Sequence, residues 1–276
     1  MWALDDPNAD QRALFAVERQ GPSQARAIPS LYCRGPWDHG LLHGGPVGGL
    51  AGWAAEHLVD PDGDQICSRL TVELLSAVPL EPLDITAVVS KPGRRSRVVD
   101  VSIGCDGRTV ARATSQWVAT AAGVEVSNGQ PPIRPSWAAD PGPSDFEYPR
   151  PGFNCDSSEL RFAEGSDEES GPGILWVRLT SPLVAGQETT PFCQVATIAD
   201  LTAAAGWEQS PTGASYINPD LTLQLTRYPT GPWIAIAAHS QRATAGVGYN
   251  DAILYDDVGS FGRVLQSLVE IPITQV

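Results

Sequence analysis

The sequence predicts an α+β protein that builds one unit twice, a curved antiparallel sheet wrapped around a central helix. Two runs of small and apolar residues have helical spacing, and each follows a pair of strand-like segments and precedes a series of alternating ones. A segment rich in proline and glycine separates the two series. Strands and helices do not alternate, so a doubly wound nucleotide-binding fold is disfavoured.

The first helix is expected from about Pro46 to Leu58, where Leu50 and Trp53 recur at helical spacing after a glycine-rich start. We expect this small-sided helix to lie close to the surrounding sheet. The N–H groups of its first turn have no partner inside the helix and are available to a carbonyl or an anion. Strands are expected at 15–19, 25–34, 67–78, 85–91, 96–104 and 110–119, the last four as an antiparallel meander.

Prolines dominate the middle of the chain between Gly123 and Pro151. Such a segment cannot form a helix, and it would interrupt a strand repeatedly. We therefore expect an extended surface linker at 123–151, with an N-terminal unit at 1–122 and a C-terminal unit at 152–276.

The second unit repeats the order of the first around a helix expected at 191–206. The segments at 70–75 (LTVELL) and 221–226 (LTLQLT) are offset by 151 residues, and Gln116 and Gln266 are offset by 150. A shared element order at a common offset indicates an internal repeat, although two antiparallel meanders can also look alike. The strands are expected at 160–163, 173–179, 216–228, 233–243, 245–255 and 262–271.

The composition excludes several classes of partner. A net charge of −14 disfavours nucleic acid and anionic membrane surfaces. No apolar run approaches the roughly 20 residues of a membrane span, and the N-terminus lacks the pattern of a signal peptide. The five scattered cysteines contain no Cys-x-x-Cys, which predicts neither a disulfide framework nor a metal site. We expect a cytoplasmic protein with reduced thiols.

Asp200 is the only carboxylate in the second helical run, residues 192–207. On the helix face beside Ala199 it would be partly buried and would need hydrogen bonds; the alternative is a solvent-facing position in mid-helix. Asn218 enters the following strand, and Gln266 stands in the last one. A buried amide beside a buried carboxylate can hold a water, although Gln266 alone also fits a solvent-facing strand position.

These features together resemble the double hotdog acyl-CoA thioesterases, the TesB-like or thioesterase II family, over essentially the whole chain. The resemblance rests on the tandem helix-wrapped sheets, the Gly44-Gly45 turn, Asp200 in the second helix and Gln266 in the last strand. It implies a tandem (double) hotdog fold, an acyl-CoA substrate, no cofactor, and hydrolysis by an activated water without a covalent intermediate. It also implies a homo-oligomer, since hotdog units pair through sheet edges.

In that family an Asp, a Thr or Ser, and a Gln hold and activate the water. The resemblance assigns Asp200 as general base, with Gln266 and Asn218 positioning the water. Asn218 departs from the usual hydroxyl, because an amide orients water but has no hydroxyl to relay a proton. Thr222 lies four residues further along the same expected strand and is a candidate substrate contact.

The family's Phe-Gly-Gly-Gln reads His43-Gly44-Gly45-Pro46 in this sequence. The resemblance makes His43, Gly44 and Gly45 candidates for binding the thioester, whose carbonyl would sit near the positive end of the helix. The phosphates of coenzyme A require cationic contacts. The candidates are the cluster of Arg94, Arg95 and Arg97 and three separate residues, Arg227, Arg242 and Arg263.

Two alternatives remain open. A histidine before a glycine- and proline-rich helix start is also loosely similar to the hotdog (3R)-hydroxyacyl-thioester dehydratases, with His43 as base and Asp200 as acid. His43 also fits a plain helix-capping role. The second alternative is a non-catalytic acyl-binding protein. An acyl-enzyme route is disfavoured, because the sequence has no Gly-x-Ser-x-Gly motif.

Overall fold

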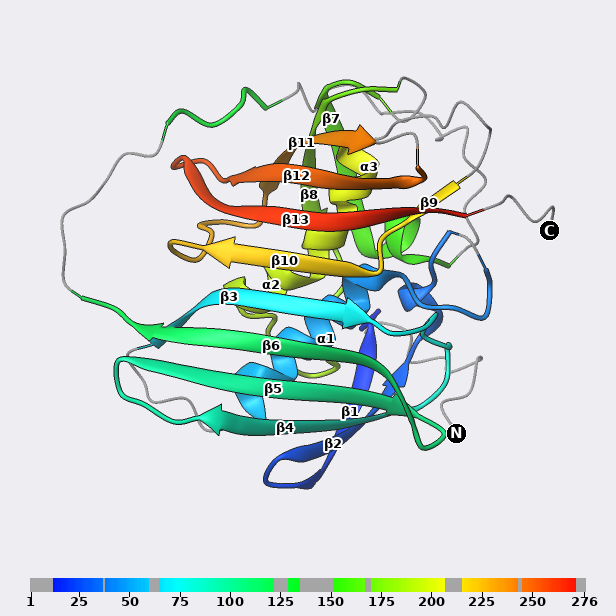
Figure 1. The fold of residues 1–276 in the computed structure, drawn as a ribbon, viewed down its shortest axis with the longest axis vertical. Helices are drawn as coiled ribbons and strands as arrows, with labels where there is room; N and C mark the ends of the chain where they lie inside the picture. The colour runs from blue at the N-terminus through cyan, green and yellow to red at the C-terminus, as the bar shows by residue number, and fades with distance from the viewer. Residues whose placement is uncertain are drawn as a thin grey trace.

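A 13-stranded antiparallel sheet dominates the molecule, and its helices pack against one side of it (Figure 1). The N-terminal and C-terminal halves lie one above the other in this view, and α1 and α2 meet behind the strands at the junction. The computed structural model describes residues 12–36, 38–59, 65–121, 129–134, 151–166, 170–206, 215–242 and 245–271.

The first half follows the predicted order of two strands, a helix and four strands. The central helix α1 begins two residues before its predicted start, because the His43 side chain caps it. The elements are β1 (Phe15–Gly21), β2 (Gln24–Pro29), the 3₁₀ turn η1 (Leu31–Cys33), α1 (Gly44–His57), β3 (Gln65–Leu74), β4 (Leu83–Lys91), β5 (Ser96–Cys105) and β6 (Arg108–Ala119).

The second half repeats this order. Most of the linker predicted at 123–151, with its proposed boundaries, lies outside the described residues. The elements are the π-helical turn η2 (Phe153–Ser157), β7 (Ser158–Glu164), β8 (Gly173–Leu179), α2 (Pro191–Ile198), η3 (Ala199–Leu201), α3 (Thr202–Ala205), β9 (Ser215–Ile217), β10 (Asp220–Leu225), β11 (Ile234–Arg242), β12 (Val247–Tyr255) and β13 (Ser260–Ile271).

The sheet order confirms the internal repeat. One half runs β1-β2-β4-β5-β6-β3, and the other runs β7-β8-β11-β12-β13-β10 when read from its own outer end. The two inner edges join antiparallel, with Thr71 of β3 opposite Thr222 of β10. The expected edge-to-edge pairing of the units is therefore made within one chain. The predicted four-strand meander is wrong in one respect, since β3 lies beside β6 and not beside β4.

The strand register corrects one of the two sequence offsets. Thr71 pairs with Thr114 in the first half, and Thr222 pairs with Leu265 in the second, so the offset is 151 on both strands. Gln266 then corresponds to Ser115 and not to Gln116. Because successive side chains on a strand face opposite sides, this slip of one residue matters: Gln266 is buried and Gln116 lies on the outer face.

The helix α1 lies against the first sheet as expected, and its glycines face α2. A Cβ on Gly48 would lie 2.8 Å from the carbonyl oxygen of Ala196, and one on Gly49 would lie 2.1 Å from Thr197 Oγ1. Neither distance leaves room for a side chain. The two central helices thus approach backbone to backbone, which brings the start of α1 next to the end of α2.

Two predicted elements are interrupted, and both breaks lie beside Asp200. The helix expected at 191–206 tightens into the 3₁₀ turn η3, which contains Asp200. The strand expected at 216–228 is split into β9 and β10, because Pro219 has no N–H and restricts the backbone of Asn218. Among the described residues, no helix has both the length and the apolar character needed to cross a membrane.

Candidate active site

Asp200 lies inside the molecule at the junction of the two halves. Its residue exposure is 7%, so the solvent-facing alternative is wrong. A carboxylate this deeply buried needs hydrogen-bond donors to offset the lost hydration. The structure supplies them from both halves of the chain.

Oδ1 of Asp200 accepts hydrogen bonds from two side-chain amides. Asn218 Nδ2 donates at 2.7 Å and Gln266 Nε2 at 3.0 Å. The break at Pro219 leaves Asn218 outside the regular ladder, and the inward register of β13 aims Gln266 at the same oxygen. All three residues assigned to the water site from the sequence are therefore brought together.

Oδ2 of Asp200 meets the start of α1, in the other half of the molecule. His43 Nδ1 lies 3.1 Å from it, and both side chains are almost fully buried. A Cβ on Gly44 would lie only 2.6 Å from Oδ2, so this approach requires glycine. The Gly45 N–H lies 3.0 Å from His43 Nδ1 and also hydrogen-bonds to Asp200.

A buried polar chain extends from Gln266 through the second sheet. Asn250 Nδ2 donates to Gln266 Oε1 at 3.0 Å, which forces the Gln266 amide nitrogen toward Asp200. Ser240 Oγ lies 2.5 Å from Asn250 Oδ1 and also contacts the Gly206 carbonyl. The sequence reasoning missed Asn250 and Ser240. Polar residues at inward positions of otherwise apolar strands were the available signal.

The hydrogen bonds to Asp200 outweigh its burial. Burial alone raises the pKa of a carboxyl group. The hydrogen bond and charge of His43, with the amide of Asn218 and the N–H of Gly45, lower it, and the pKa of Asp200 ends below its ordinary value. Asp200 is therefore ionised at neutral pH.

His43 is held on three sides. Its backbone N–H donates to the Cys33 carbonyl at 2.8 Å, its side chain caps α1, and the Phe153 ring packs against the imidazole with centroids 4.8 Å apart. Phe153 is fully buried in the π-helical turn η2, a type of turn that is frequent at functional sites.

Thr222 is the one predicted site residue that the structure does not bring to this cluster. It alternates with the buried Leu221 and Leu223 along β10, so its side chain lies on the outer face of the sheet. Its hydroxyl contacts Thr71 Oγ1 at 3.2 Å across the junction of the halves.

Three of the arginines weighed as phosphate contacts have other partners. Arg227 makes a bidentate pair with Asp256 at 2.5 and 2.7 Å, and Arg263 pairs with Asp251 at 3.2 Å. Arg97 is buried over the Trp117 ring, while Arg94 and Arg95 are exposed in the turn between β4 and β5. The side chain of Arg242 lies outside the described residues.

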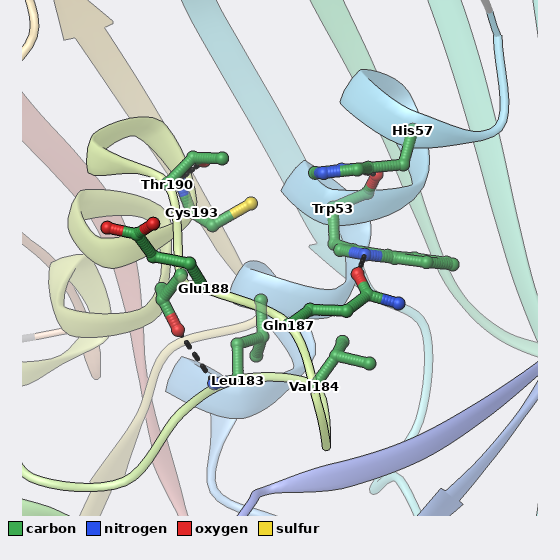
Figure 2. Close-up of a pocket in the computed structure, with 9 residues that line it drawn as sticks. Trp53, His57, Leu183, Val184, Gln187, Glu188, Thr190 and Cys193 are labelled. Atoms are coloured by element: carbon green, nitrogen blue, oxygen red, sulfur yellow. Dashed lines mark hydrogen bonds between the residues drawn. The ribbon is translucent and has the colours of Figure 1, made fainter.

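A small pocket lies at the opposite end of the helix pair (Figure 2). There Trp53 and His57 of α1 face Cys193 of α2, and Trp53 Nε1 donates to Gln187 Oε1 at 2.9 Å. Glu56 beside it accepts hydrogen bonds from Thr190 Oγ1 at 2.7 Å and Cys193 Sγ at 3.4 Å.

Burial and the charge of Glu56 raise the pKa of the Cys193 thiol well above its ordinary value. A thiol that stays protonated is no nucleophile. At this end Glu56 accepts from a hydroxyl and a thiol, whereas Asp200 accepts from two side-chain amides.

Two family descriptions match the sequence. The acyl-CoA thioesterase N-terminal domain matches residues 33–118, and the acyl-CoA thioesterase C-terminal domain matches residues 130–269. No curated protein has a significantly similar sequence.

Solved structures with the same architecture cover nearly the whole chain. An acyl-CoA thioesterase II, TesB2, from Mycobacterium marinum is 14% identical, with 95% of this chain and 97% of that one covered and a TM-score of 0.68. A tesB protein from Mycobacterium avium subsp. paratuberculosis is 16% identical over 93% and 96%, with a TM-score of 0.69. A conserved hot dog fold protein from Alicyclobacillus acidocaldarius is 14% identical over 93% and 96%, with a TM-score of 0.68. The tandem hotdog architecture predicted from the sequence is confirmed.

Proposed function

The chain belongs to the acyl-CoA thioesterase family, and on that premise we propose that it hydrolyses an acyl-CoA at the Asp200 centre by direct attack of water. The observation that carries the proposal is the meeting of Asp200, Asn218 and Gln266 around one carboxylate oxygen. These are the three residues that the resemblance assigned to the hydrolytic water. The proposal has no covalent intermediate.

The amides give the water a defined position. Each side-chain NH₂ group has two N–H donors, and one donor of Asn218 and one of Gln266 are used on Asp200 Oδ1. Gln266 Nε2 also donates to the Asp200 carbonyl at 3.4 Å, so the second N–H of Asn218 is the amide donor left for a water. Removal of its proton by a group of this centre contributes roughly 10² to 10⁴ in rate.

The thioester carbonyl is placed at the first turn of α1. The Gly44 N–H has no partner inside the helix, while the Gly45 N–H is used on Asp200 and Pro46 has no N–H. The positive end of the helix dipole favours the negative oxygen of a tetrahedral intermediate. Gly44 permits the close approach, because its Cα lies directly against the Asp200 carboxylate. The carbonyl carbon would then lie between the helix N-terminus and the water.

Self-association belongs to the same proposal, as does the cytoplasmic location expected from the scattered cysteines. Apolar side chains on the outer face of the second sheet support it. Val247 is 57% exposed and pairs with Val269, which is 41% exposed and pairs with Ile217, 39% exposed. A contiguous apolar surface of this kind suits contact with a second copy. Light scattering is expected to give a mass above the 29.3 kDa of one chain.

The test is thiol release from acyl-CoA esters of graded chain length. The wild-type protein is expected to release coenzyme A and free acid in equal amounts, and Asp200→Asn is expected to release neither while keeping a melting temperature near that of the wild type. Coenzyme A alone serves as the binding control. Acyl-CoA binding without thiol release at any chain length would replace hydrolysis by the non-catalytic acyl-binding alternative.

One observation favours a second candidate, the hydration or dehydration of a (3R)-hydroxyacyl thioester. The contact between His43 and Asp200 is the pair that this alternative requires. Crotonyl-CoA separates the two reactions. Loss of the enoyl absorbance without thiol release would identify a hydratase, and thiol release would identify hydrolysis.

A further inference from the structure

Both oxygens of Asp200 are already occupied. Oδ1 accepts from Asn218 and Gln266, Oδ2 faces His43, and the Gly45 N–H also hydrogen-bonds to the carboxylate. Two carboxylate oxygens offer about four lone-pair sites, and these contacts fill them. A carboxylate that is fully hydrogen-bonded and has a lowered pKa is a weak base, because the most effective general base has a pKa near the working pH.

The contact between His43 and Asp200 fixes the position of one proton. Nδ1 and Oδ2 are 3.1 Å apart, a distance at which two bare lone pairs would repel each other. One proton must lie between them. The Gly45 N–H points at Nδ1 at 3.0 Å and also hydrogen-bonds to Asp200. Asp200 is ionised, so the proton resides on His43 Nδ1 and is donated to Oδ2; Nδ1 then cannot accept from Gly45, whose N–H is left to the carboxylate. The partner of one ring nitrogen sets the state of the other.

The neutral ring protonated on Nδ1 has its free lone pair on Nε2. Within the described ranges, no hydrogen bond to Nε2 of His43 is found. The ring is held by Phe153 and by the contact with Asp200, and 9% of the side chain remains exposed. Of the titratable groups described around this ring, Asp200 is the one in contact, and the nearby Cys33 thiol donates elsewhere, to the Leu14 carbonyl.

From this geometry we propose that His43, through Nε2, is the proton acceptor of the proposed hydrolysis, and that Asp200 orients the imidazole and stabilises its charged form. The inference rests on the proposed function and assigns the base within it. It revises the sequence hypothesis, in which Asp200 takes the proton itself. Asn218 and Gln266 then act by holding Asp200 in place.

The reaction balances in two steps. Nε2 takes a proton from the water as the water oxygen bonds to the thioester carbon, which gives a tetrahedral oxyanion at the start of α1 and an imidazolium facing Asp200. The oxyanion then collapses, the carbon–sulfur bond breaks, and Nε2–H protonates the leaving sulfur. The products are free acid, coenzyme A thiol and neutral His43.

The kinetic test uses His43→Asn. Asparagine is also a good helix N-cap, and its amide reproduces the Nδ1–H donor, but it has nothing in place of Nε2. Thiol release is expected to fall by about 10² to 10⁴ in kcat, with KM within about threefold and little change in melting temperature. The matched control is His39→Asn in the exposed loop before α1, which is expected to keep full activity.

Chemical rescue separates a base from a cap. His43→Ala removes the ring and leaves space for added imidazole, which is expected to restore thiol release in proportion to the free base. Asp200→Asn is expected not to respond. A His43→Asn variant that keeps more than about a tenth of wild-type kcat would overturn the proposal and return the role of base to Asp200.

The third experiment determines which ring nitrogen of His43 carries the proton. It does not depend on activity, so it tests the inference even if no acyl-CoA is hydrolysed. The protein has four histidines, and ¹⁵N-labelled imidazoles can be assigned by single substitutions. The neutral His43 ring is expected to carry its proton on Nδ1 in the wild type and to lose this preference in Asp200→Asn. A wild-type ring with its proton on Nε2 would refute the inference, whereas absent thiol release with the Nδ1 tautomer would refute only hydrolysis.

Discussion

Three equivalent register positions in the two sheets carry side chains of different polarity. In the first half, Val89 pairs with Val99 and Val99 pairs with Ser115 across β4, β5 and β6. The same three register positions in β11, β12 and β13 are the hydrogen-bonded Ser240, Asn250 and Gln266.

In the first half the side-chain hydrogen bonds stay between neighbouring strand residues. Ser115 donates to the Val99 carbonyl and accepts from Trp117 Nε1. In the second half the chain of side-chain hydrogen bonds continues from Gln266 to Asp200. The backbone repeat is therefore conserved in the fold, while one copy has two valines and a serine at these positions and the other has three polar residues linked to Asp200.

The two ends of the helix pair show the same division. The His43 cap of α1 meets Asp200, whereas the Thr190 cap of α2 meets Glu56. At the spacing of these two caps, Asp200 corresponds to Trp53, whose indole N–H donates to Gln187 at its own end of the helix pair. The repeated fold thus has a buried or half-buried carboxylate at each end of the helix pair, and of the two it is Asp200 that accepts hydrogen bonds from side-chain amides.

The largest loss in this comparison is expected for Gln266→Leu. It removes one donor from Asp200 and leaves Asn250 Nδ2 without its acceptor. Removal of one such donor costs about 10² to 10³ in rate, and we expect kcat for thiol release to fall within that range. The matched variant Gln116→Leu, on the outer face of the first half, is expected to keep activity. Equal losses in both would show that the two halves contribute alike.

A somewhat smaller loss is expected for Gly44→Ala. The new Cβ would lie 2.6 Å from Asp200 Oδ2 and must displace the carboxylate from His43. A shift of about 1 Å costs roughly 10²-fold in rate. Gly52→Ala, whose Cβ would meet Ala196 Cβ at 3.1 Å further along α1, is the control and is expected to retain activity. Full activity in Gly44→Ala would show that the rate does not depend on the position of the Asp200 carboxylate.

Asn250→Val copies Val99 of the first half into the second. It leaves Gln266 Oε1 buried without a donor, which costs about 1 to 3 kcal/mol of folding stability. Urea unfolding is expected to record that loss, together with a fall of about tenfold in kcat as Gln266 loses its orientation. A variant that unfolds at the wild-type urea concentration would remove Asn250 from the supporting chain.

The smallest effect is expected in acid. The pKa of Asp200 is lower in the folded chain than its unfolded value of about 3.9, so the folded state binds fewer protons. The resulting stability is present above about pH 4 and is lost as the pH falls through the folded pKa. Unfolding free energy measured across this range is expected to fall more steeply for the wild type than for Asp200→Asn. Parallel curves would contradict the lowered pKa.

The sequence predicted the parts of this molecule that depend on local pattern. Alternation and turn residues located the strands, and β8 was placed at its observed bounds. Asp200, Asn218 and Gln266 were selected as polar residues in apolar elements. The register was the weak point, because an offset of 150 instead of 151 equated Gln266 with an outward residue, Gln116.

The remaining features depend on contacts between distant segments. The pairing of β3 with β6, the burial of the α1 glycines against α2 and the contact of His43 with Asp200 each join residues far apart in the chain. Single-sequence periodicity contains no information on such pairs. His43 was therefore chosen as a thioester contact and was paired with Asp200 only in the dehydratase alternative; their contact and burial emerged from the fold.

The most direct measurement compares thiol release by Asp200→Asn and Glu56→Gln, the carboxylates at the two ends of the helix pair. The account predicts that Asp200→Asn loses at least about 10³-fold in kcat while Glu56→Gln stays within about threefold of the wild type. An active Asp200→Asn, or a Glu56→Gln that loses as much, would contradict a single equipped centre in the second copy of the repeat.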